Sequence, residues 1–384
     1  MILRALQLQS FRAHQDTELT FAPKINLIHG PNGVGKTNVL EAIHYLCLTK
    51  SFVASRDKYA LRKDAPYFQL EGTFDGTRRS DQTVRLVYVP GEGKQVFVNG
   101  APLERLTDIV GQLPVVVFSP EDHALTAEGP SERRRFLDNI LSQAHPVYLD
   151  DLMKYRRARR QRNELLKQYR SRGGPPAEVI EPWTEELILL GSRIIARRRQ
   201  FLDAFGEYLQ QAYRQIKAVA EEPSIEYDTI AGLDPDESDA EAIAEAFRDA
   251  LERTRDGERS RGTTLVGPQR DELIFRLDGL EVRRYGSQGQ HRTFGMALKL
   301  AKYFYLHDRL DEHPLLLLDD AFGKLDDERS SVFLELLRAD VIGQSMVTAT
   351  EDRVFQQAVP LHESNHQSIH LTRAGTESAA VVSH

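Results

Sequence analysis

The stretch from Gly30 to Thr37 constrains this chain more than any other, because it fits the pattern G-x-x-x-x-G-K-[ST]. An apolar run ending at Ile28 precedes it and apolar residues recur at helical spacing after it, which predicts a strand, a loop and a helix. Glycines let the backbone N–H groups of such a loop turn inward around an anion, and the helix start adds its positive dipole end. The sequence therefore predicts a nucleotide phosphate site made of Gly30, Pro31, Asn32, Gly33, Val34, Gly35, Lys36 and Thr37.

Two side chains of this loop have predicted chemical roles. Lys36 can reach the β- and γ-phosphates of a nucleotide, so we expect it to serve both binding and catalysis. The Thr37 hydroxyl is a predicted ligand of Mg²⁺.

A second part of the site is predicted where four leucines end in Asp319 and Asp320. Carboxylates that follow a buried strand lie at the carboxyl edge of a parallel sheet, where ligands bind in open α/β folds. We expect Asp319 to hold Mg²⁺, and Asp320 to orient or deprotonate the attacking water as a catalytic residue. Taken alone, two aspartates after a strand also suit a turn or a helix cap.

Length and composition bound the class of protein. The 384 residues suffice for two domains or for one domain with a large insertion. The single cysteine, Cys47, excludes disulfides and a cysteine-rich metal site within one chain. No apolar run approaches the ~20 residues that span a bilayer, and the first residues lack a signal-peptide core, so we expect a cytoplasmic protein.

The pattern along the chain predicts an α/β fold with a helical insertion. Residues 1–120 are rich in strand signals, including an Asn99-Gly100 hairpin turn, and strand signals return from 271 to a last strand at 345–350. Between them we predict helices at about 148–172 and 183–216, joined by the breaker at 173–176 as an antiparallel hairpin, and a third helix after an acidic linker. The tail from about 373 is expected to be loose.

A glycine-flanked serine, Ser287, precedes a predicted helix at 290–306. Backbone and hydroxyl donors at a helix start suit an anion, although a plain helix N-cap explains the same residues.

The first helix of the predicted hairpin is strongly basic. From Lys154 to Arg172 it carries nine cationic residues against one acid, Glu164, and Arg197–Arg199 form a second cluster. Arginine forks suit phosphate oxygens, and Tyr155 and Tyr169 are interleaved, but a solvated helical face is the alternative. In a chain of net charge −7 this stretch is the predicted DNA contact, without base readout: Lys154, Arg156, Arg157, Arg159, Arg160, Arg162, Lys167, Arg170 and Arg172.

The order of these motifs resembles the head domains of ABC-type ATPases, and among them the RecF family of SMC-like DNA repair proteins. The resemblance covers residue 1 to about 355, through "SFRAHQDTELTF", "FSPEDHAL", "GPSERRRFLD", "VGPQRDEL", "GSQGQHRTF" and "LLLLDDAFGKLDDERS". It implies an ABC-type P-loop ATPase head, a mixed sheet with flanking helices, into which a helical subdomain with a short antiparallel hairpin is inserted. On this basis we predict lobe I at 1–125 and 309–384, and lobe II at 126–308.

The resemblance also implies a site shared by two chains. In such proteins the segment matching Ser287, Gln288, Gly289 and Gln290 contacts the γ-phosphate of ATP bound to the other subunit, so an ATP-dependent homodimer is expected. Asp326 is expected to cross that interface, Arg12 to touch the nucleotide from the side, and Asn32 to help position the water.

The function implied is recombinational repair and maintenance of replication forks. An ATP-driven dimer is expected to bind duplex or gapped DNA and, with RecO and RecR, to promote loading of RecA, while slow, DNA-stimulated ATP hydrolysis resets it. The alternatives are the ATP-binding subunit of a transporter, a chromosome-organising head and a small-molecule kinase.

Three departures from the family pattern concern hydrolysis. Asp320 stands where a catalytic Glu is usual, although RecF-like sequences commonly carry Asp there. No switch histidine occurs in the stretch 345–353, where Thr348 or Thr350 is the candidate substitute. No glutamine follows the strand at 115–118, and Ser119 to Asp122 occupy its place.

Overall fold

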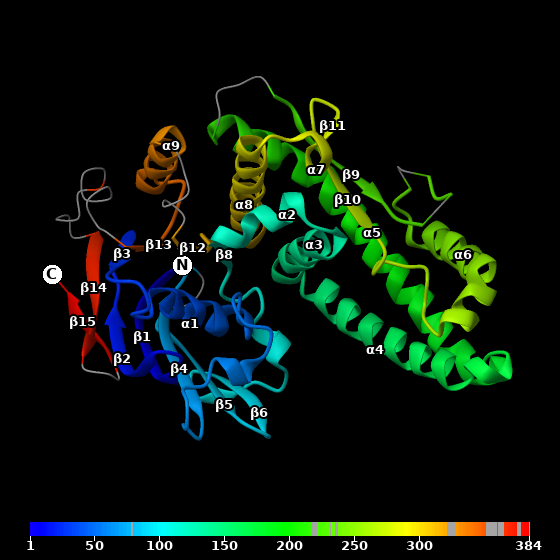
Figure 1. Cartoon of the computed structure of the whole chain (residues 1–384), viewed down its shortest axis with the longest axis horizontal. Helices are drawn as coiled ribbons and strands as arrows, with labels where there is room; N and C mark the ends of the chain where they lie inside the picture. Colours follow the sequence, from blue (N-terminus) through cyan, green and yellow to red (C-terminus); the bar gives the residue numbers. More distant parts are fainter. Residues whose placement is uncertain are drawn as a thin grey trace. The chain divides into compact units, whose positions relative to one another are not determined.

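The computed structural model describes residues 1–77, 80–216, 221–230, 232–234, 237–320, 327–350, 359, 365–374 and 378–383. The chain forms two compact units, coloured along the sequence in Figure 1. Unit 1 comprises Met1–Asp122, Gln215–Ala218 and Leu298–His384, and unit 2 comprises His123–Arg214 and Val219–Ala297.

The first sheet of unit 1 has the strand order β2-β1-β4-β5-β6-β7, and every pairing in it is antiparallel. Buried and half-buried residues alternate along β4, as expected for a strand with one face on a core. Asn99 and Gly100 turn the chain between β6 and β7 with φ of 50° and 81°, so the predicted hairpin is confirmed. The strands are β1 (Ile2–Phe11), β2 (His14–Thr20), β4 (Phe68–Asp75), β5 (Gln82–Val89), β6 (Gly93–Val98) and β7 (Ala101–Pro102).

The second sheet of unit 1 has the order β15-β14-β3-β13-β12-β8 and is parallel except for β15. Every residue of β8 and β12 is buried, which is typical of central strands covered on both faces. Because β3, β8, β12 and β13 run in one direction, the loops that follow them meet at one edge. The strands are β3 (Ile25–His29), β8 (Val115–Phe118), β12 (Leu315–Leu318), β13 (Ser345–Ala349), β14 (His366–Ala374) and β15 (Ser378–Ser383).

Helix α1 (Lys36–Leu48) joins the two sheets through one hydrophobic core. Each residue from Val39 to Leu48 is buried, and the core cluster combines this helix with apolar side chains of both sheets. Helix α9 (Asp327–Arg338) packs against the parallel sheet, where Phe333 contacts Phe118 with ring centroids 5.1 Å apart. Helix α8 (Gln288–Leu310) begins in unit 2 and continues into unit 1 from Leu298.

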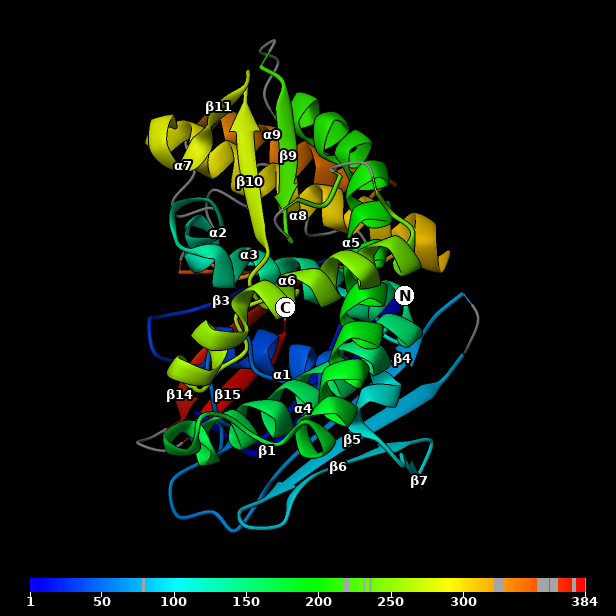
Figure 2. The same ribbon diagram turned by 90° about the vertical axis from the view of Figure 1, so that its right-hand side faces the viewer.

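Unit 2 is mainly helical, with one antiparallel sheet of order β11-β10-β9 (Figure 2). The α4–α5 hairpin is confirmed: Arg162 of α4 donates to Thr184 of α5 at 3.1 Å, and the chain turns between them at 173–176. Among the described residues no helix is long and apolar enough to cross a membrane. The elements are α2 (Ala124–Ala127), α3 (Pro130–Ala144), α4 (Pro146–Gln168), α5 (Ala177–Ile216), α6 (Ala240–Arg261), α7 (Val282–Tyr285), β9 (Pro223–Asp228), β10 (Glu272–Leu277) and β11 (Leu280–Glu281).

Three strands were not expected. In β9 only Pro223 is fully buried, while half-buried Ile225 and Tyr227 alternate with exposed polar residues, a short strand pattern that was not predicted; β9 pairs with β10 over its whole length. Strand β14 is largely polar, but it adds to the sheet beside β3 and buries Ile369 and Leu371. The prediction of a loose tail from about 373 was wrong, because β15 pairs with β14 over Ser378–Ser383.

Candidate functional site

The loop between β3 and α1 has the geometry that its glycines predict. Gly30 has φ of 144°, and a Cβ there would lie 2.3 Å from the Leu371 carbonyl oxygen. Gly35 has φ of 104° and caps α1, and a Cβ there would lie 2.7 Å from Nε2 of His14. Both positions therefore exclude any larger residue, and the backbone of the loop leads directly into the N-terminus of α1.

Lys36, the first residue of α1, folds back over this loop. Its Nζ donates to the carbonyl oxygens of Gly30 at 2.7 Å and Pro31 at 3.0 Å. Burial lowers the pKa of Lys36, against the attraction of Asp320 and Asp319, which raises it. The ammonium group is thus held at the loop, beside two carboxylates.

Thr37 and Asp319 meet at the edge of the parallel sheet. The Thr37 hydroxyl donates to Oδ1 of Asp319 at 2.7 Å, and Thr348 donates to the same oxygen at 2.9 Å. Burial raises the pKa of the Asp319 carboxyl, while the bonds from Thr37 and Thr348 lower it. The structure therefore brings together the two predicted Mg²⁺ ligands from opposite ends of the chain.

Asp320 is exposed and has a left-handed backbone, with φ of 45°. Its N–H donates to the Thr348 hydroxyl at 2.9 Å, so one threonine bridges the Asp319 carboxylate and the Asp320 backbone. Thr350 lies at the same edge and donates to the side-chain oxygen of Asn32 at 3.4 Å. Both threonines of the last predicted strand thus contact the site, Thr348 from inside and Thr350 at its rim.

These residues fit Mg²⁺ by their chemistry. The Thr37 hydroxyl and the Asp319 carboxylate are hard oxygen donors, and their oxygens lie 2.7 Å apart. Mg²⁺ is usually held by one or two carboxylates together with phosphates and waters. Phosphate oxygens of a nucleotide would complete this coordination.

Arg12, in the turn between β1 and β2, contacts α1, and His14, the first residue of β2, contacts the end of the loop. Arg12 makes a bidentate pair with the buried Glu41 of α1, with N–O distances of 2.8 and 2.7 Å, and donates to the Tyr59 carbonyl oxygen. His14 is fully buried and donates from Nε2 to the Gly35 carbonyl oxygen at 3.1 Å. His14 was not among the predicted site residues, although it lies two residues after Arg12 in the same motif.

Ser287 and Gln290 form a reciprocal capping box at the start of α8. The Ser287 hydroxyl accepts from the Gln290 N–H at 3.2 Å, and the Gln290 side chain accepts from the Ser287 N–H at 2.9 Å. Ser287 and Gln288 are exposed, and Gly289 is half-buried. The capping role that the sequence left open is present, and the hydroxyl hydrogen of Ser287 stays available for an acceptor. Asp326, the predicted interface aspartate, lies outside the described residues.

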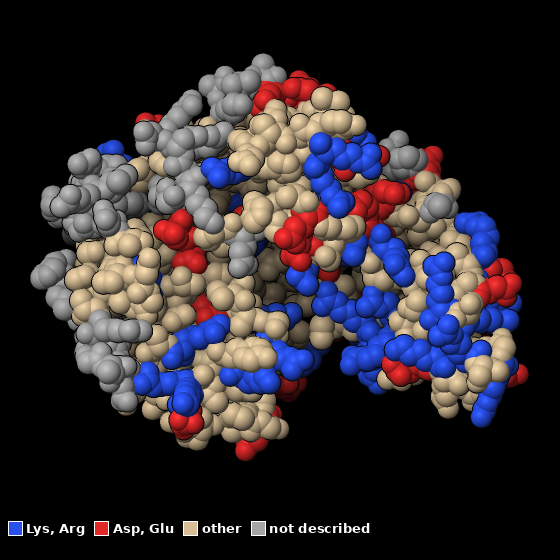
Figure 3. Space-filling model, viewed as in Figure 1, with Lys and Arg blue, Asp and Glu red and all other residues tan. Residues whose placement is uncertain are grey.

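The basic hairpin is mostly exposed, and Lys and Arg gather over α4, η4 (Arg170–Arg172) and α6 in Figure 3. Three of the exposed cations have acidic partners: Lys154 pairs with Asp150, Arg156 with Asp138, and Lys167 with Glu164. Seven of the nine predicted DNA contacts are exposed and Arg159 is half-buried; the exposed ones are Lys154, Arg156, Arg157, Arg160, Lys167, Arg170 and Arg172.

Arg162 corrects this prediction. It is 5% exposed, pairs with the buried Glu258 at 2.7 Å and donates to Thr264 at 3.0 Å, so it cannot face DNA. The second basic cluster is also wrong in part, because Arg198 and Arg199 are buried inside unit 2. Tyr155 is buried as well and bonds Gln269, which removes it as a base-stacking residue.

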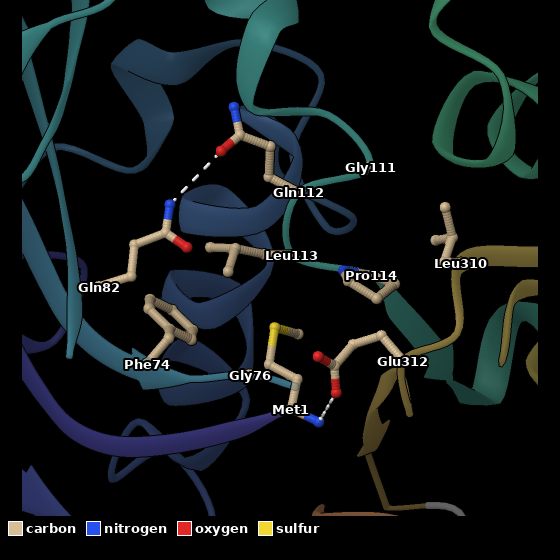
Figure 4. A pocket seen from close by; sticks show the side chains of 10 residues that line it. All are labelled: Met1, Phe74, Gly76, Gln82, Gly111, Gln112, Leu113, Pro114, Leu310 and Glu312. Carbon is tan, nitrogen blue, oxygen red and sulfur yellow. Dashed lines mark hydrogen bonds and ion pairs between the residues drawn. The ribbon is translucent and has the colours of Figure 1, made fainter. Parts of the chain in front are cut away.

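A cavity of about 210 Å³ lies elsewhere in unit 1 and holds none of the predicted site residues (Figure 4). Gln82 and Gln112 meet across it at 3.4 Å, and the Met1 amine pairs with Glu312 at its edge. The predicted nucleotide site is therefore separate from this cavity.

The sequence matches known proteins over nearly its whole length. A family model described as "RecF/RecN/SMC N terminal domain" matches residues 2–373. The chain is 65% identical over 382 residues to the DNA replication and repair protein RecF of Salinibacter ruber. The aligned region covers 99% of this chain and 92% of that protein. It is 43% identical over 357 residues to the protein of the same description from Chloroherpeton thalassium, covering 93% and 97% of the two chains.

Solved structures give the same result. The recombination mediator protein RecF, in a structure described as "RecF-ATPrS in RecFOR pathway", superimposes with a TM-score of 0.88 at 29% identity, covering 99% of this chain and 98% of that chain. An Smc head bound to the C-winged helix domain of ScpA superimposes with a TM-score of 0.57 at 14% identity, covering 100% and 98%, which shows a shared fold alone. The predicted fold class, an ABC-type ATPase head, is confirmed. The chain belongs to the RecF/RecN/SMC N-terminal domain family and, within it, to the RecF proteins of DNA replication and repair.

Proposed function

We propose that this chain binds ATP with Mg²⁺ at the loop after β3 and uses ATP to control self-association and DNA binding. The observation that carries the proposal is that the hydroxyls of Thr37 and Thr348 both donate to Oδ1 of Asp319. Two relatives solved as RecF-ATP and RecF-ATPrS support ATP as the nucleotide.

The residues of the site have distinct roles in this proposal. The loop amides and the N-terminus of α1 hold the phosphates, and Lys36 exchanges the Gly30 and Pro31 carbonyl oxygens for phosphate oxygens. Mg²⁺ neutralises charge on the β- and γ-phosphates when it is bound. Asp320 orients or deprotonates the attacking water, Asn32 helps to place it, and Thr348 holds the backbone that carries Asp320.

The site is completed by a second copy of the chain. Ser287 is exposed at the N-terminus of a 23-residue helix, and its hydroxyl donates to a γ-phosphate while its oxygen still accepts from Gln290. Gln288, Gly289 and Gln290 extend the same surface, and Asp326 and Arg12 keep their proposed places at the interface and beside the nucleotide. We propose that unit 1 is lobe I of this head and that unit 2 is lobe II. The unit boundaries replace the lobe boundaries that the sequence predicted.

DNA binds to the exposed cations of the α4–α5 hairpin in this account. Arginine and lysine without base-reading partners favour contacts to the phosphate backbone, which suit duplex or gapped DNA irrespective of sequence. The structures of RecF in the RecFOR pathway support RecO and RecR as partners, with promotion of RecA loading at single-strand gaps as the outcome. Slow hydrolysis of ATP, stimulated by DNA, releases the complex.

The experiment that tests the proposal is a DNA titration in the presence of ATP and Mg²⁺ or of ADP. We expect tighter binding with ATP, and an affinity that falls by ~0.9 log units per log unit of salt for each phosphate neutralised. Equal affinity in the two nucleotide states, or no dependence on salt, contradicts it. The alternative of a transporter ATP-binding subunit is not favoured by the relatives, which are DNA replication and repair proteins.

A further inference from the structure

His14 connects the first residue of strand β2 to the start of helix α1. Its side chain is fully buried, and its Nε2 lies 3.1 Å from the Gly35 carbonyl oxygen. The two residues are in close contact, since a Cβ added to Gly35 would lie 2.7 Å from the same nitrogen. The proposed function gives His14 no role, although it touches the residue that caps α1 at the end of the phosphate loop.

The hydrogen bonds of His14 fix where its proton lies. A carbonyl oxygen only accepts, so Nε2 carries the hydrogen and donates it to Gly35. Nδ1 is then left as an acceptor, and the buried Thr17 hydroxyl donates to it at 3.1 Å. Burial lowers the pKa of His14, and the bond to Gly35 raises it less, so the ring is neutral at neutral pH. The two bonds therefore hold one tautomer in one orientation.

The backbone that carries His14 is itself firmly held. Arg12, two residues earlier, has a left-handed φ of 55° and donates its N–H to the Ala60 carbonyl oxygen at 2.8 Å. Its side chain is paired with the buried Glu41 of α1. Left-handed backbone is costly for a residue with a Cβ and persists only where surrounding contacts impose it. His14 therefore approaches Gly35 from a rigid support.

The Gly35 carbonyl decides where the first amide of α1 points. Its oxygen accepts from the N–H groups of Asn38 and Val39 at 2.9 and 3.2 Å, the first bonds of the helix, and His14 adds a third donor from outside the helix. The peptide between Gly35 and Lys36 is trans, so the Lys36 N–H points away from this oxygen and out of the helix start. An N–H at this position has no acceptor within the helix, which leaves it for a phosphate oxygen.

We propose that His14 is a positioning residue for phosphate binding, which holds the Gly35 carbonyl so that the Lys36 N–H points at the nucleotide phosphates. The inference rests on the proposed function and adds to it a residue that touches neither the phosphates nor Mg²⁺. Because His14 acts on the backbone of the loop, its effect concerns the phosphates and not the base. Loss of such positioning weakens the binding of ATP and therefore raises KM more than it lowers kcat.

The test compares three variants of the full chain. His14→Phe keeps a planar ring but makes neither hydrogen bond, and we expect a fluorescent ATP analogue to bind about tenfold more weakly. His14→Gln places an amide N–H at similar reach, so affinity should return to within about threefold of wild type. The matched control is Thr17→Val, which removes only the bond between Thr17 and His14 and should stay within about twofold of wild type.

Hydrolysis kinetics separate positioning from a merely structural role. In His14→Phe we expect KM for ATP to rise about tenfold while kcat stays within about twofold, and inhibition by inorganic tripolyphosphate to weaken by the same factor as ATP binding. A lower kcat at unchanged KM indicates only a smaller folded fraction and overturns the inference, and so does an equal loss of affinity in Thr17→Val.

Two further outcomes distinguish this inference from the function on which it rests. A wild-type chain that binds no ATP contradicts the proposed function and overturns the role of His14 with it. A wild-type chain that binds ATP, together with a His14→Phe variant of equal affinity, overturns the role of His14 alone.

Discussion

Thr37 and Asp319 are separated by 282 positions in the sequence and share a hydrogen bond of 2.7 Å. The parallel pairing of β3, β13 and β12 makes this contact possible, because it brings the ends of strands from both halves of the chain to one edge. Helix α1 then presents Thr37 from the loop side. The nucleotide site is thus a product of topology as much as of the motif itself.

Asp319→Asn is expected to abolish the Mg²⁺ dependence of nucleotide binding. An amide keeps one acceptor oxygen but lacks the charge that holds a divalent cation. Titration of a fluorescent ATP analogue with and without Mg²⁺ measures the effect, which we expect to be at least about tenfold. Asp340→Asn, at an exposed carboxylate, is the control, and a Mg²⁺ response equal to wild type in Asp319→Asn would remove Asp319 from the metal site.

Lys36→Met and Asp320→Asn should separate binding from turnover. Lys36→Met removes the cation at the loop, so tight ATP binding is lost. Asp320→Asn leaves the phosphate site intact, and we expect it to bind ATP and remain dimeric without turning over. Equilibrium binding and steady-state hydrolysis on both variants check this, and residual wild-type turnover in Asp320→Asn would assign the water-activating role elsewhere.

Arg160 and Arg162 are expected to behave in opposite ways. Arg162→Met leaves Glu258 buried without its partner, which costs about 3–5 kcal/mol of stability. Arg160→Met changes an exposed side chain, so stability should stay within about 0.5 kcal/mol while the salt slope of DNA binding falls by about 0.9. Urea unfolding and DNA titrations at several salt concentrations measure both. Equal destabilisation by the two variants contradicts the assignment of faces on α4.

The stability of the chain should fall with acid through His44. Burial lowers the pKa of this histidine to about 4, from about 6.5 in the unfolded chain. The unfolded state therefore binds the proton first as the pH falls below about 6.5, and stability is lost at up to about 1.4 kcal/mol per pH unit down to about pH 4. His44→Gln should flatten this dependence in unfolding measurements between pH 4 and 7, and an unchanged slope would show that His44 does not carry it.

The parts of the site that the sequence predicted are those carried by local pattern. The loop from Gly30 to Thr37 and the leucines before Asp319 each predict the end of a strand and the functional side chains that follow it. The bridge made by Thr348 needed the register of β13 against β12, which pattern alone does not supply. Strand β14 was missed for the same reason, because its partner β3 stabilises a polar segment with little strand propensity of its own.

The burial of Arg162 follows in part from the periodicity of α4. The buried residues of α4 recur at helical spacing, at positions 148, 152, 155, 158, 162 and 166, and Arg162 falls on this face. A count of cations ignores the helical face, whereas the periodicity separates Arg160 from Arg162. The acidic partner Glu258 lies 96 positions away, and only the fold reveals it.

The most direct measurement of the shared site mixes two inactive variants, Lys36→Met and Ser287→Arg. Each is expected to be inactive alone, since one lacks a phosphate contact and the other blocks the serine segment. Pairing across two molecules gives one intact composite site, so the mixture should regain hydrolysis, up to roughly a quarter of the wild-type rate if the variants pair at random and one of two sites per mixed dimer works. A mixture as inactive as its components would mean that each chain uses its own serine segment, which contradicts the account.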